Sequence, residues 1–262
     1  MSGPPGRRPG DPPRAASIDV AFTPSGLGAT GVAVVVDVLR ASSTIVTALE
    51  VGYRRVLCTA SPEEATRLRG PGRLLAGERG CLPIEGFDYG NSPQALGRAR
   101  GEDLVLCTTN GTPAILSALA AAREVLVGSL LNLNALTERI PPGQDATIVC
   151  AGTDGRFALE DAYVAGRIVA RLAGARTDAA LAAERLAGAY RNAREALTQS
   201  ADAAVLRATE QGSDIDFCAR ESVTAVVPEV TMLTPQVGVA SIWLADGEAS
   251  GSFEERHTAP AH

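Results

Sequence analysis

Short apolar runs that alternate with helical segments constrain the fold of this chain more than any other feature. Each run is rich in Val or Leu and is closed by small or polar residues; the runs lie at 31–36, 56–59, 74–76, 104–107, 125–127 and 147–150. Such a run is typical of a strand that is buried on both faces of a parallel sheet. Strands that alternate with helices predict an α/β fold, a largely parallel sheet flanked by helices.

Capping residues mark two helix starts within this alternation. Ser61, Pro62 and Glu64 fit the N-cap, N1 and N3 positions of a helix. The stretch Asn91–Pro93 has the same chemistry and predicts a further helix start.

The C-terminal part of the chain has a different character. Residues 178–210 are rich in Ala, Leu and Arg and are expected to be helical, whereas 214–218 and 237–244 are expected to be extended. The polar residues 245–262 are predicted to be a disordered tail.

The domain organisation follows from these stretches. Residues 1–16, which consist mostly of Pro, Gly and Arg, are predicted to be a disordered extension and lack the apolar segment of a secretory signal. Residues 17–244 are predicted to form one domain, with a division into lobes at 17–145 and 146–244 left open.

Charge and cysteine usage exclude several classes of protein. The net charge of −6 argues against a nucleic-acid binder or a membrane-surface binder. No stretch approaches the roughly 18 to 20 apolar residues that span a bilayer. The five cysteines form no C-x-x-C pair, which favours reduced, buried thiols in a cytoplasmic protein. A homo-oligomer is left open.

Two missing residue types narrow the chemistry further. The chain contains no lysine, and its only histidines are His257 and His262 in the polar tail. A histidine base, a histidine metal ligand, a P-loop lysine and a Schiff base are therefore excluded. A catalyst must be built from Asp, Glu, Arg, Cys, hydroxyls, backbone amides and a metal.

The segment that follows the run 31–36 carries the strongest functional signal. It places Asp37, Arg40, Ser42 and Ser43 at the end of a buried strand and at the start of a helix. Open α/β sheets bind ligands at this position, and helix N-termini bind anions. This mixture of groups suits a metal-bridged anion, most simply a phosphate.

Other predicted strands are also followed by small, polar or charged residues. The carboxyl ends of parallel strands meet at one edge of a sheet. We therefore expect these loops to converge on one site, although each alone fits ordinary helix capping. The loops contribute Glu78, Arg79, Thr108, Thr109, Asn110, Gly111, Thr112, Ser129, Asn132 and Gly152.

Adjacent acids at 160 and 161 offer oxygen ligands to a metal. Mg²⁺ typically takes one or two carboxylates, which Asp37 and either Glu160 or Asp161 would supply. Adjacent residues do not share a helical face, so we expect one acid to point inward and the other to be solvated. Both could instead simply complement the helix macrodipole.

Two other functions stay open. Cys150 and Arg156 match the C-x₅-R spacing of thiol phosphatases, but the site would lack a preceding histidine. The second alternative is a non-catalytic binder of small anionic metabolites.

Several segments together resemble the 2-phosphosulfolactate phosphatase (ComB-like) family, in that family's order. The resemblance covers about residues 18–230 and rests on 36–44, 76–80, 86–93, 107–112, 127–132, 150–152 with 160–161, and 214–219. It implies an α/β fold particular to this family. It also implies a Mg²⁺-dependent acid phosphatase that hydrolyses (2R)-2-phospho-3-sulfolactate to 3-sulfolactate and phosphate, a step of coenzyme M biosynthesis.

The residues and the resemblance together give a predicted site for a small anionic phosphorylated substrate. Catalytic roles are predicted for Asp37, Arg40 and Glu78, and metal binding for Asp37, Glu160 and Asp161. Asp37 is either the nucleophile or a metal ligand with water attacking, and we favour the second role. The predicted substrate-binding residues are Arg40, Ser42, Ser43, Arg79, Asn91, Thr108, Thr109, Asn110, Gly111, Thr112, Ser129, Asn132 and Gly152.

Overall fold

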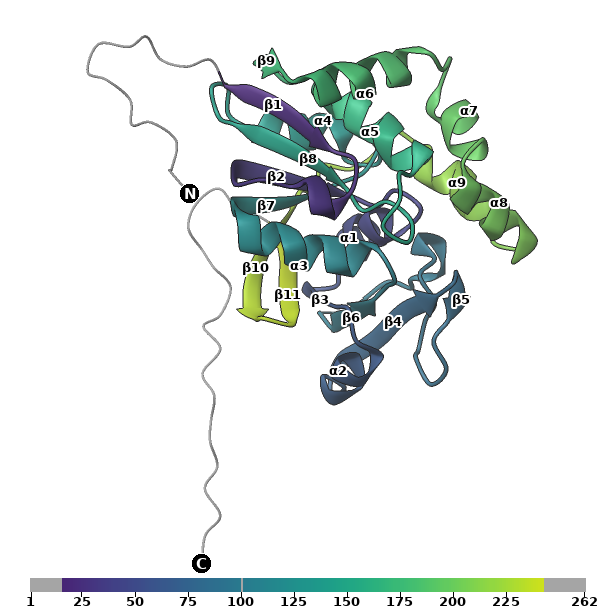
Figure 1. Ribbon diagram of the computed structural model, residues 1–262. Coiled ribbons are helices and arrows are strands. Elements are labelled where there is room, and N and C mark those ends of the chain that lie inside the picture. Colours follow the sequence, from purple (N-terminus) through teal and green to yellow (C-terminus); the bar gives the residue numbers. More distant parts are fainter. Residues whose placement is uncertain (1–15, 100, 243–262) are drawn as a thin grey trace, which may run out of the picture.

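The computed structural model describes residues 16–99 and 101–242 (Figure 1). The predictions of disorder for 1–16 and 245–262 fall, apart from residue 16, outside the described residues. The described strands are β1 (Ser17–Ala21), β2 (Thr30–Val36), β3 (Arg55–Thr59), β4 (Arg73–Arg79), β5 (Leu82–Pro83), β6 (Asp103–Cys107), β7 (Ala122–Gly128), β8 (Ala146–Cys150), β9 (Ala175–Arg176), β10 (Pro228–Thr234) and β11 (Val237–Ile242). The α-helices are α1 (Ala41–Glu50), α2 (Pro62–Arg67), α3 (Gly111–Ala121), α4 (Leu133–Arg139), α5 (Leu159–Val169), α6 (Asp178–Gly188), α7 (Ala193–Thr198), α8 (Ala201–Ala208) and α9 (Ser213–Cys218).

The strands form one sheet in the order β5-β4-β6-β3-β11-β10-β7-β2-β8-β1-β9. The α/β prediction is confirmed, and most neighbouring strands are parallel. The sheet crosses the boundary at 145–146 at which a division into two lobes was left open, because β8 of the second segment pairs with β2 and β1 of the first.

The expectation that all parallel strands end at one edge of the sheet is wrong. The hairpin β10–β11 pairs antiparallel with β7 on one side and with β3 on the other. The group β4-β6-β3 therefore runs opposite in sense to the group β7-β2-β8-β1-β9. No local sequence pattern indicated that the chain would return to insert a hairpin between them.

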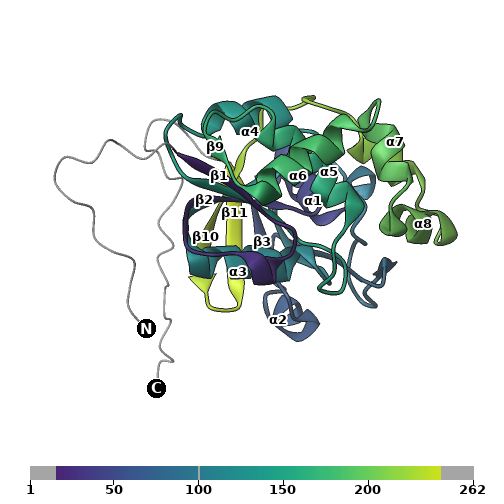
Figure 2. The same cartoon turned by 45° about the horizontal axis from the view of Figure 1, so that its top comes forward.

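Helices α1 and α3 lie between these two groups and contact strands of both (Figure 2). Their inward residues, among them Ile45 and Ile115, share one buried cluster with Val35 of β2 and Leu106 of β6. The sheet thus packs around two helices, and this packing brings the ends of β2, β4 and β6 together.

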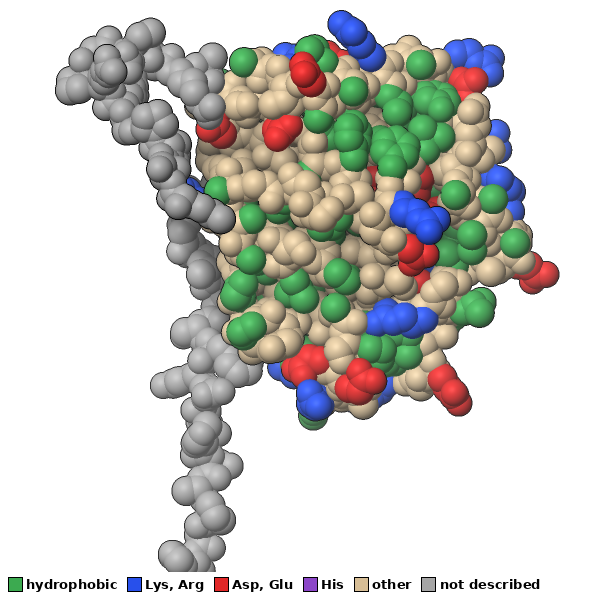
Figure 3. Space-filling model, viewed as in Figure 1, with side chains coloured by type: hydrophobic (Ala, Val, Ile, Leu, Met, Phe, Trp, Pro, Cys, Tyr) green, Lys and Arg blue, Asp and Glu red, His purple; other side chains and the backbone are tan. Residues whose placement is uncertain are grey.

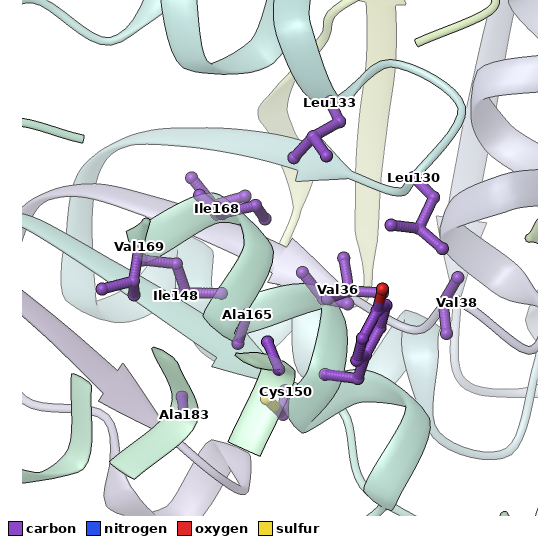
Figure 4. Packing of buried hydrophobic residues seen from close by; sticks show 14 of the residues in the cluster. Val36, Val38, Leu130, Leu133, Ile148, Cys150, Ala165, Ile168, Val169 and Ala183 are labelled. Carbon is purple, nitrogen blue, oxygen red and sulfur yellow. The ribbon is translucent and has the colours of Figure 1, made fainter. Parts of the chain in front are cut away.

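The outer faces of the two groups are covered separately. Helix α5 packs over β2 and β8 and is flanked by α4 and by α6, which contacts β1. Val36, Ile148 and Ile168 belong to the second buried cluster on this face (Figure 4). Helix α2 covers the other group through Ala65, beside Leu75. Alternate residues of each central strand enter different clusters, which explains why these runs are apolar throughout.

Local structure confirms one capping prediction and corrects two predictions of secondary structure. The Ser61 side chain accepts a hydrogen bond from the Glu64 amide of α2 at 3.2 Å. The stretch Asn91–Pro93 opens only the three-residue 3₁₀ helix η2 (Pro93–Ala95). Residues 214–218 are not extended but form most of α9.

The prediction that residues 178–210 are helical is confirmed, and the segment forms the three helices α6, α7 and α8. Asn192 and Ser200 cap α7 and α8, because each side chain accepts a hydrogen bond from a first-turn amide.

None of the helices among residues 16–99 and 101–242 is long and apolar enough to cross a membrane.

Candidate active site

Asp37 directly follows β2 and lies where α1 and α3 begin. Its Oδ1 accepts a hydrogen bond from the Ala41 amide, the first residue of α1, at 3.2 Å. Its Oδ2 lies against Gly111, the first residue of α3: a Cβ added to Gly111 would stand 2.5 Å from that oxygen. Helix N-termini attract anions through their free amides and the macrodipole. The Asp37 carboxylate therefore lies at two helix starts, where an anion such as phosphate can bind.

Glu78 lies at the end of β4 and is buried beside the same loops. Its Oε1 accepts from the Thr109 amide at 2.8 Å, and its Oε2 accepts from the Cys81 amide at 2.9 Å. Two backbone donors fix the orientation of the carboxylate. After burial and Asp202, the charge of Glu78 is a further cause of the raised pKa of Asp37, so the two carboxyl groups are close enough to interact electrostatically.

Glu160 and Asp161 lie in the first turn of α5, and both are buried, so the expectation of one solvated acid is wrong. Asp161 accepts from the Val38 amide at 2.9 Å and from the Gly152 amide at 3.1 Å. Glu160 is enclosed on the side of Asp202, with which it forms a hydrogen bond. Asp161 thus contacts the loop after β2, and Glu160 contacts Asp202 of α8. Both acids are therefore buried, although they lie on different faces of α5.

Asp202 of α8 is a site residue that the sequence did not indicate. Its Oδ2 accepts from the Thr153 hydroxyl at 2.9 Å. In the sequence it stands two residues after the N-cap Ser200, where an acid usually serves only the macrodipole. No local signal distinguishes it from such a residue.

Burial and crowding of these carboxylates raise their pKa values. Burial, with the charges of Asp202 and Glu78, raises the pKa of Asp37 to about 7. Burial and Asp202 raise the pKa of Glu160 to about 8. Burial, Asp37 and Glu160 raise the pKa of Asp161 well above its usual range. Perturbed acids in one place are typical of functional sites.

The acids suit a hard cation, although no metal-binding arrangement is preformed. Among the described residues, no three His, Cys, Asp or Glu side chains are grouped so that they could hold a metal ion. Mg²⁺ typically takes only one or two carboxylates, with water and substrate phosphate as its other ligands. Asp37 fits this requirement because its Oδ2 accepts no hydrogen bond from the described residues, and each oxygen of Asp161 accepts only one.

The two predicted arginines are already engaged with protein groups. Arg40 is buried and donates to Asp214 at 2.7 Å, to Gln211 and to the Cys81 carbonyl. Arg79 donates to the carbonyls of Glu78 and Ala60 and to the sulfur of Cys107. Arg79 has no carboxylate partner among the described residues, so its charge is less compensated than that of Arg40.

Most of the predicted hydroxyls hold the loops in place. Ser42 bonds to the backbone of Asp37, and Ser43 donates to the Val38 carbonyl. Thr108 and Thr112 cap the start of α3 reciprocally: each side-chain oxygen accepts from the amide of the other.

Thr109 differs from these residues. Its buried Oγ1 has no hydrogen-bond partner among residues 16–99 and 101–242, although its amide donates to Glu78. An unpartnered hydroxyl of this kind is free to bind a ligand.

The remaining predicted residues, Gly152, Asn91, Ser129 and Asn132, come from three further loops. Gly152 has a φ of +66°, and its amide serves Asp161. Asn91 has a buried Oδ1 without a partner. The amide of Asn132 instead holds the carbonyls of Val127 and Val226, and its Oδ1 accepts from the Ser129 amide. Ser129 and Asn132 thus use these groups to join the β7–α4 loop to the C-terminal segment.

The thiol-phosphatase alternative does not fit the structure. Cys150 is fully buried in the core beneath α5, as Figure 4 shows. Burial, with the charges of Asp161 and Glu160, raises the pKa of this thiol well above its usual range. A thiolate nucleophile requires the opposite shift and access to the substrate.

Comparison with known proteins gives a consistent result. Residues 21–232 match the family model described as 2-phosphosulpholactate phosphatase. The chain is 40% identical over 215 residues to a protein of Thermotoga maritima named probable 2-phosphosulfolactate phosphatase, which covers 80% of this chain and 94% of the relative. Proteins of the same name from Deinococcus radiodurans and Thermus thermophilus are 41% and 38% identical, over 75% and 81% of this chain and 86% and 92% of each relative.

Proposed function

Because the chain belongs to the 2-phosphosulfolactate phosphatase family, a family of phosphoric monoester hydrolases, we propose that it hydrolyses (2R)-2-phospho-3-sulfolactate to 3-sulfolactate and phosphate. The relatives carry this activity in their names, and the chain covers almost their whole length. A closely related phosphorylated acid would place the same demands on the site.

The observation that supports this function best is the position of Asp37. Its carboxylate lies between the first residues of α1 and α3. The first-turn amides of a helix lack intrahelical acceptors and can bind phosphate oxygens. The free Thr109 hydroxyl lies in the loop before α3 and adds a donor. Phosphate and a carboxylate can thus meet at one place.

Mg²⁺ is the proposed cofactor, held by Asp37 with Asp161 or Glu160. When bound, it would neutralise charge on the phosphoryl group and orient that group. The support is the chemistry of the donor set: hard oxygens whose burial, together with the charges of neighbouring acids, holds the pKa of Asp37 and of Glu160 above their usual values. Asp37 serves as a ligand in this proposal, and Glu78 faces the same site.

The chain's own residues would perform three tasks. The start of α3 and Thr109 would bind phosphate oxygens, and Arg79 would contribute positive charge. In the arrangement in which Asp161 rather than Glu160 holds the metal, Glu160, whose pKa burial and Asp202 raise to about 8, would give its proton to the departing alkoxide. Arg40 would hold the loop that carries Asp37 through its bond to Asp214.

The enzyme would then serve a step of the coenzyme M biosynthetic type. The net charge of −6 fits a cytoplasmic enzyme of small metabolites rather than a binder of nucleic acid. The face seen in Figure 3 carries acidic and basic side chains in mixture, without a large patch of one sign.

The deciding experiment measures phosphate release from 2-phospho-3-sulfolactate with Mg²⁺ and with excess EDTA. We expect turnover only with the metal. Full turnover in EDTA would remove the metal from the proposal, and no turnover under either condition would leave a non-catalytic binder of anionic metabolites. If Asp37 attacked phosphorus itself, acid quenching during turnover would trap a phosphorylated protein.

A further inference from the structure

Gln211 follows the end of α8, where the backbone is held by two hydrogen bonds. Glu210 has a φ of +60°, and the Gln211 amide donates to the Leu206 carbonyl at 2.7 Å. With the bond from the Glu210 amide to the Arg207 carbonyl, this is the Schellman pattern that ends a helix. The Gln211 side chain therefore extends from a fixed point of the backbone.

The side-chain amide of Gln211 joins two loops of the candidate active site. Its Oε1 accepts from the Arg40 guanidinium, and its Nε2 donates to the Cys81 carbonyl at 2.8 Å and to the Thr209 hydroxyl at 3.0 Å. A guanidinium can only donate and a carbonyl can only accept, so these partners determine which way round the amide lies. Gln211 thus links the loop after β2, which carries Asp37, to the turn between β4 and β5, which carries Cys81.

The Cys81 backbone extends this link to Glu78. The Cys81 amide donates to Glu78 Oε2 at 2.9 Å, while the carbonyl of the same residue accepts from Gln211. Cys81 has a φ of +66° and precedes β5, a two-residue strand at the edge of the sheet. Arg40 reaches the same carbonyl at 3.4 Å, beyond the usual range of an N–H···O bond. Gln211 is therefore the closer donor to this turn.

Electrostatic interactions place Cys81 beside the acids of the site. Burial raises the pKa of the Cys81 thiol to about 11, and the charges of Arg40 and Glu78 act on that pKa in opposite directions. The charge of Asp37 raises it as well. A displacement of Cys81 would therefore move Glu78 relative to Asp37.

We propose that Gln211 is a positioning residue of the proposed phosphatase: it holds the Cys81 carbonyl, and through the Cys81 amide it fixes the direction in which Glu78 faces the substrate. The inference rests on the proposed function and on the predicted catalytic role of Glu78. It requires the Nε2 donor of Gln211, whereas a role confined to anchoring Arg40 would require only the Oε1 acceptor.

Two variants separate the donor from the acceptor. Gln211→Glu keeps an oxygen for Arg40 but cannot donate to the Cys81 carbonyl, and Gln211→Met, which is similar in length, removes both bonds. The matched control is Gln144→Glu, a half-buried glutamine that precedes β8, at the end of that strand remote from the site. Turnover of 2-phospho-3-sulfolactate with Mg²⁺ is measured for each variant alone and in a Glu78→Gln background, and urea unfolding checks that each variant is folded.

Both Gln211 variants should lower kcat about 10- to 100-fold while KM changes less than about threefold, the pattern of a displaced catalytic group rather than a lost substrate contact. In the Glu78→Gln background the same changes should cost much less, because the carboxylate that they displace is absent. Gln144→Glu should match the wild type.

Wild-type kcat in Gln211→Glu would overturn the proposal, since the donor to Cys81 would then be dispensable. Equal losses with and without Glu78→Gln would overturn it too, because Gln211 would then act by another route. If Gln211→Met does not fold, Gln211→Glu alone decides, and loss of folding in both would make Gln211 structural. If the wild-type enzyme releases no phosphate from phosphosulfolactate, the proposed function fails and this inference fails with it.

Discussion

Arg40 and Asp214 form an ion pair in the protein interior, with Arg40 Nη1 2.7 Å from Asp214 Oδ2 and side chains that are 1% and 2% exposed. Asp214 also accepts hydrogen bonds from Ser92 and Gln94. The pair joins the loop after β2 to α9 and to the segment at η2. The guanidinium that the sequence offered as a substrate ligand therefore has a structural partner 174 residues away.

Removing Arg40 should destabilise the protein strongly. Arg40→Ala leaves Asp214 buried without its cation, which typically costs about 3 to 5 kcal/mol of unfolding free energy. Arg194→Ala is the control, because the Arg194–Asp216 pair is 71% and 58% exposed and should contribute at most about 1 kcal/mol. Urea unfolding measures both. An unchanged midpoint in Arg40→Ala, together with a raised KM, would instead show that Arg40 chiefly binds substrate.

Asp37→Asn should separate activity from stability. We expect kcat to fall at least about a hundredfold, the scale of losing a central electrostatic group. Folding should not suffer, because burial and neighbouring acids disfavour the charged form of Asp37 and raise its pKa to about 7. At pH 8 the variant should thus unfold at the wild-type urea concentration or above it. A variant that loses stability but retains turnover per folded molecule would make Asp37 structural; exposed Asp178→Asn is the control.

Glu160 should make the metal-free protein less stable as pH rises. Its pKa is raised from 4.5 to about 8, so the folded state holds a proton that the unfolded chain has lost between these values. Unfolding then releases a proton, and rising pH favours unfolding across this window. In EDTA, Glu160→Gln should show a shallower decline than the wild type. The idea fails if the two declines are equal, and exposed Glu138→Gln should decline like the wild type.

Gly111→Ala should damage the site through Asp37. The new Cβ would clash with the Ala41 Cβ and stand 2.5 Å from Asp37 Oδ2, so the carboxylate or the starts of α1 and α3 must move. We expect kcat to fall more than about tenfold, since a shift near 1 Å at reacting groups can cost a hundredfold. Gly188→Ala in α6 is the control: its Cβ meets nothing within 4 Å, and the change should stabilise the helix by up to about 1 kcal/mol. Wild-type kcat in Gly111→Ala would show that Asp37 tolerates displacement.

Cys150→Ser should cost stability and leave most of the activity. The thiol is fully buried, and a hydroxyl there without a partner costs about 1 to 3 kcal/mol. No bond to phosphorus passes through sulfur in the proposed reaction, so Mg²⁺-dependent turnover should persist. Thiol labelling of the native protein should spare Cys150, whose pKa is raised by burial. Abolished turnover in a folded variant would restore the thiol-phosphatase hypothesis.

Local chemistry explains where the sequence predictions succeeded. The central strands are apolar throughout because their alternate side chains enter different buried clusters: Val34 packs on one face of β2 and Val35 on the other. Ser61 caps α2 through an amide only three residues away. The loop around Asp37 follows a strand and begins a helix, so its position could also be inferred from neighbouring residues.

Long-range packing decided what the sequence patterns could not. Hairpin β10–β11 reverses the sense of the group β4-β6-β3 relative to the group β7-β2-β8-β1-β9, so the ends of β2 and β6 meet around α1 and α3 instead of along one edge. Asp202 reaches the site because α8 folds back onto Thr153, 49 residues earlier in the chain.

The sequence by itself determined the α/β class, the central strands and the loops that carry Asp37 and Glu78, because each depends on hydrophobic pattern and capping within a few residues. The tertiary structure alone decided which acids share the site, which arginine is buried in an ion pair and which hydroxyl is left free. Those properties depend on burial and on partners far away in the chain, and a buried charge takes its pKa and its role from what surrounds it.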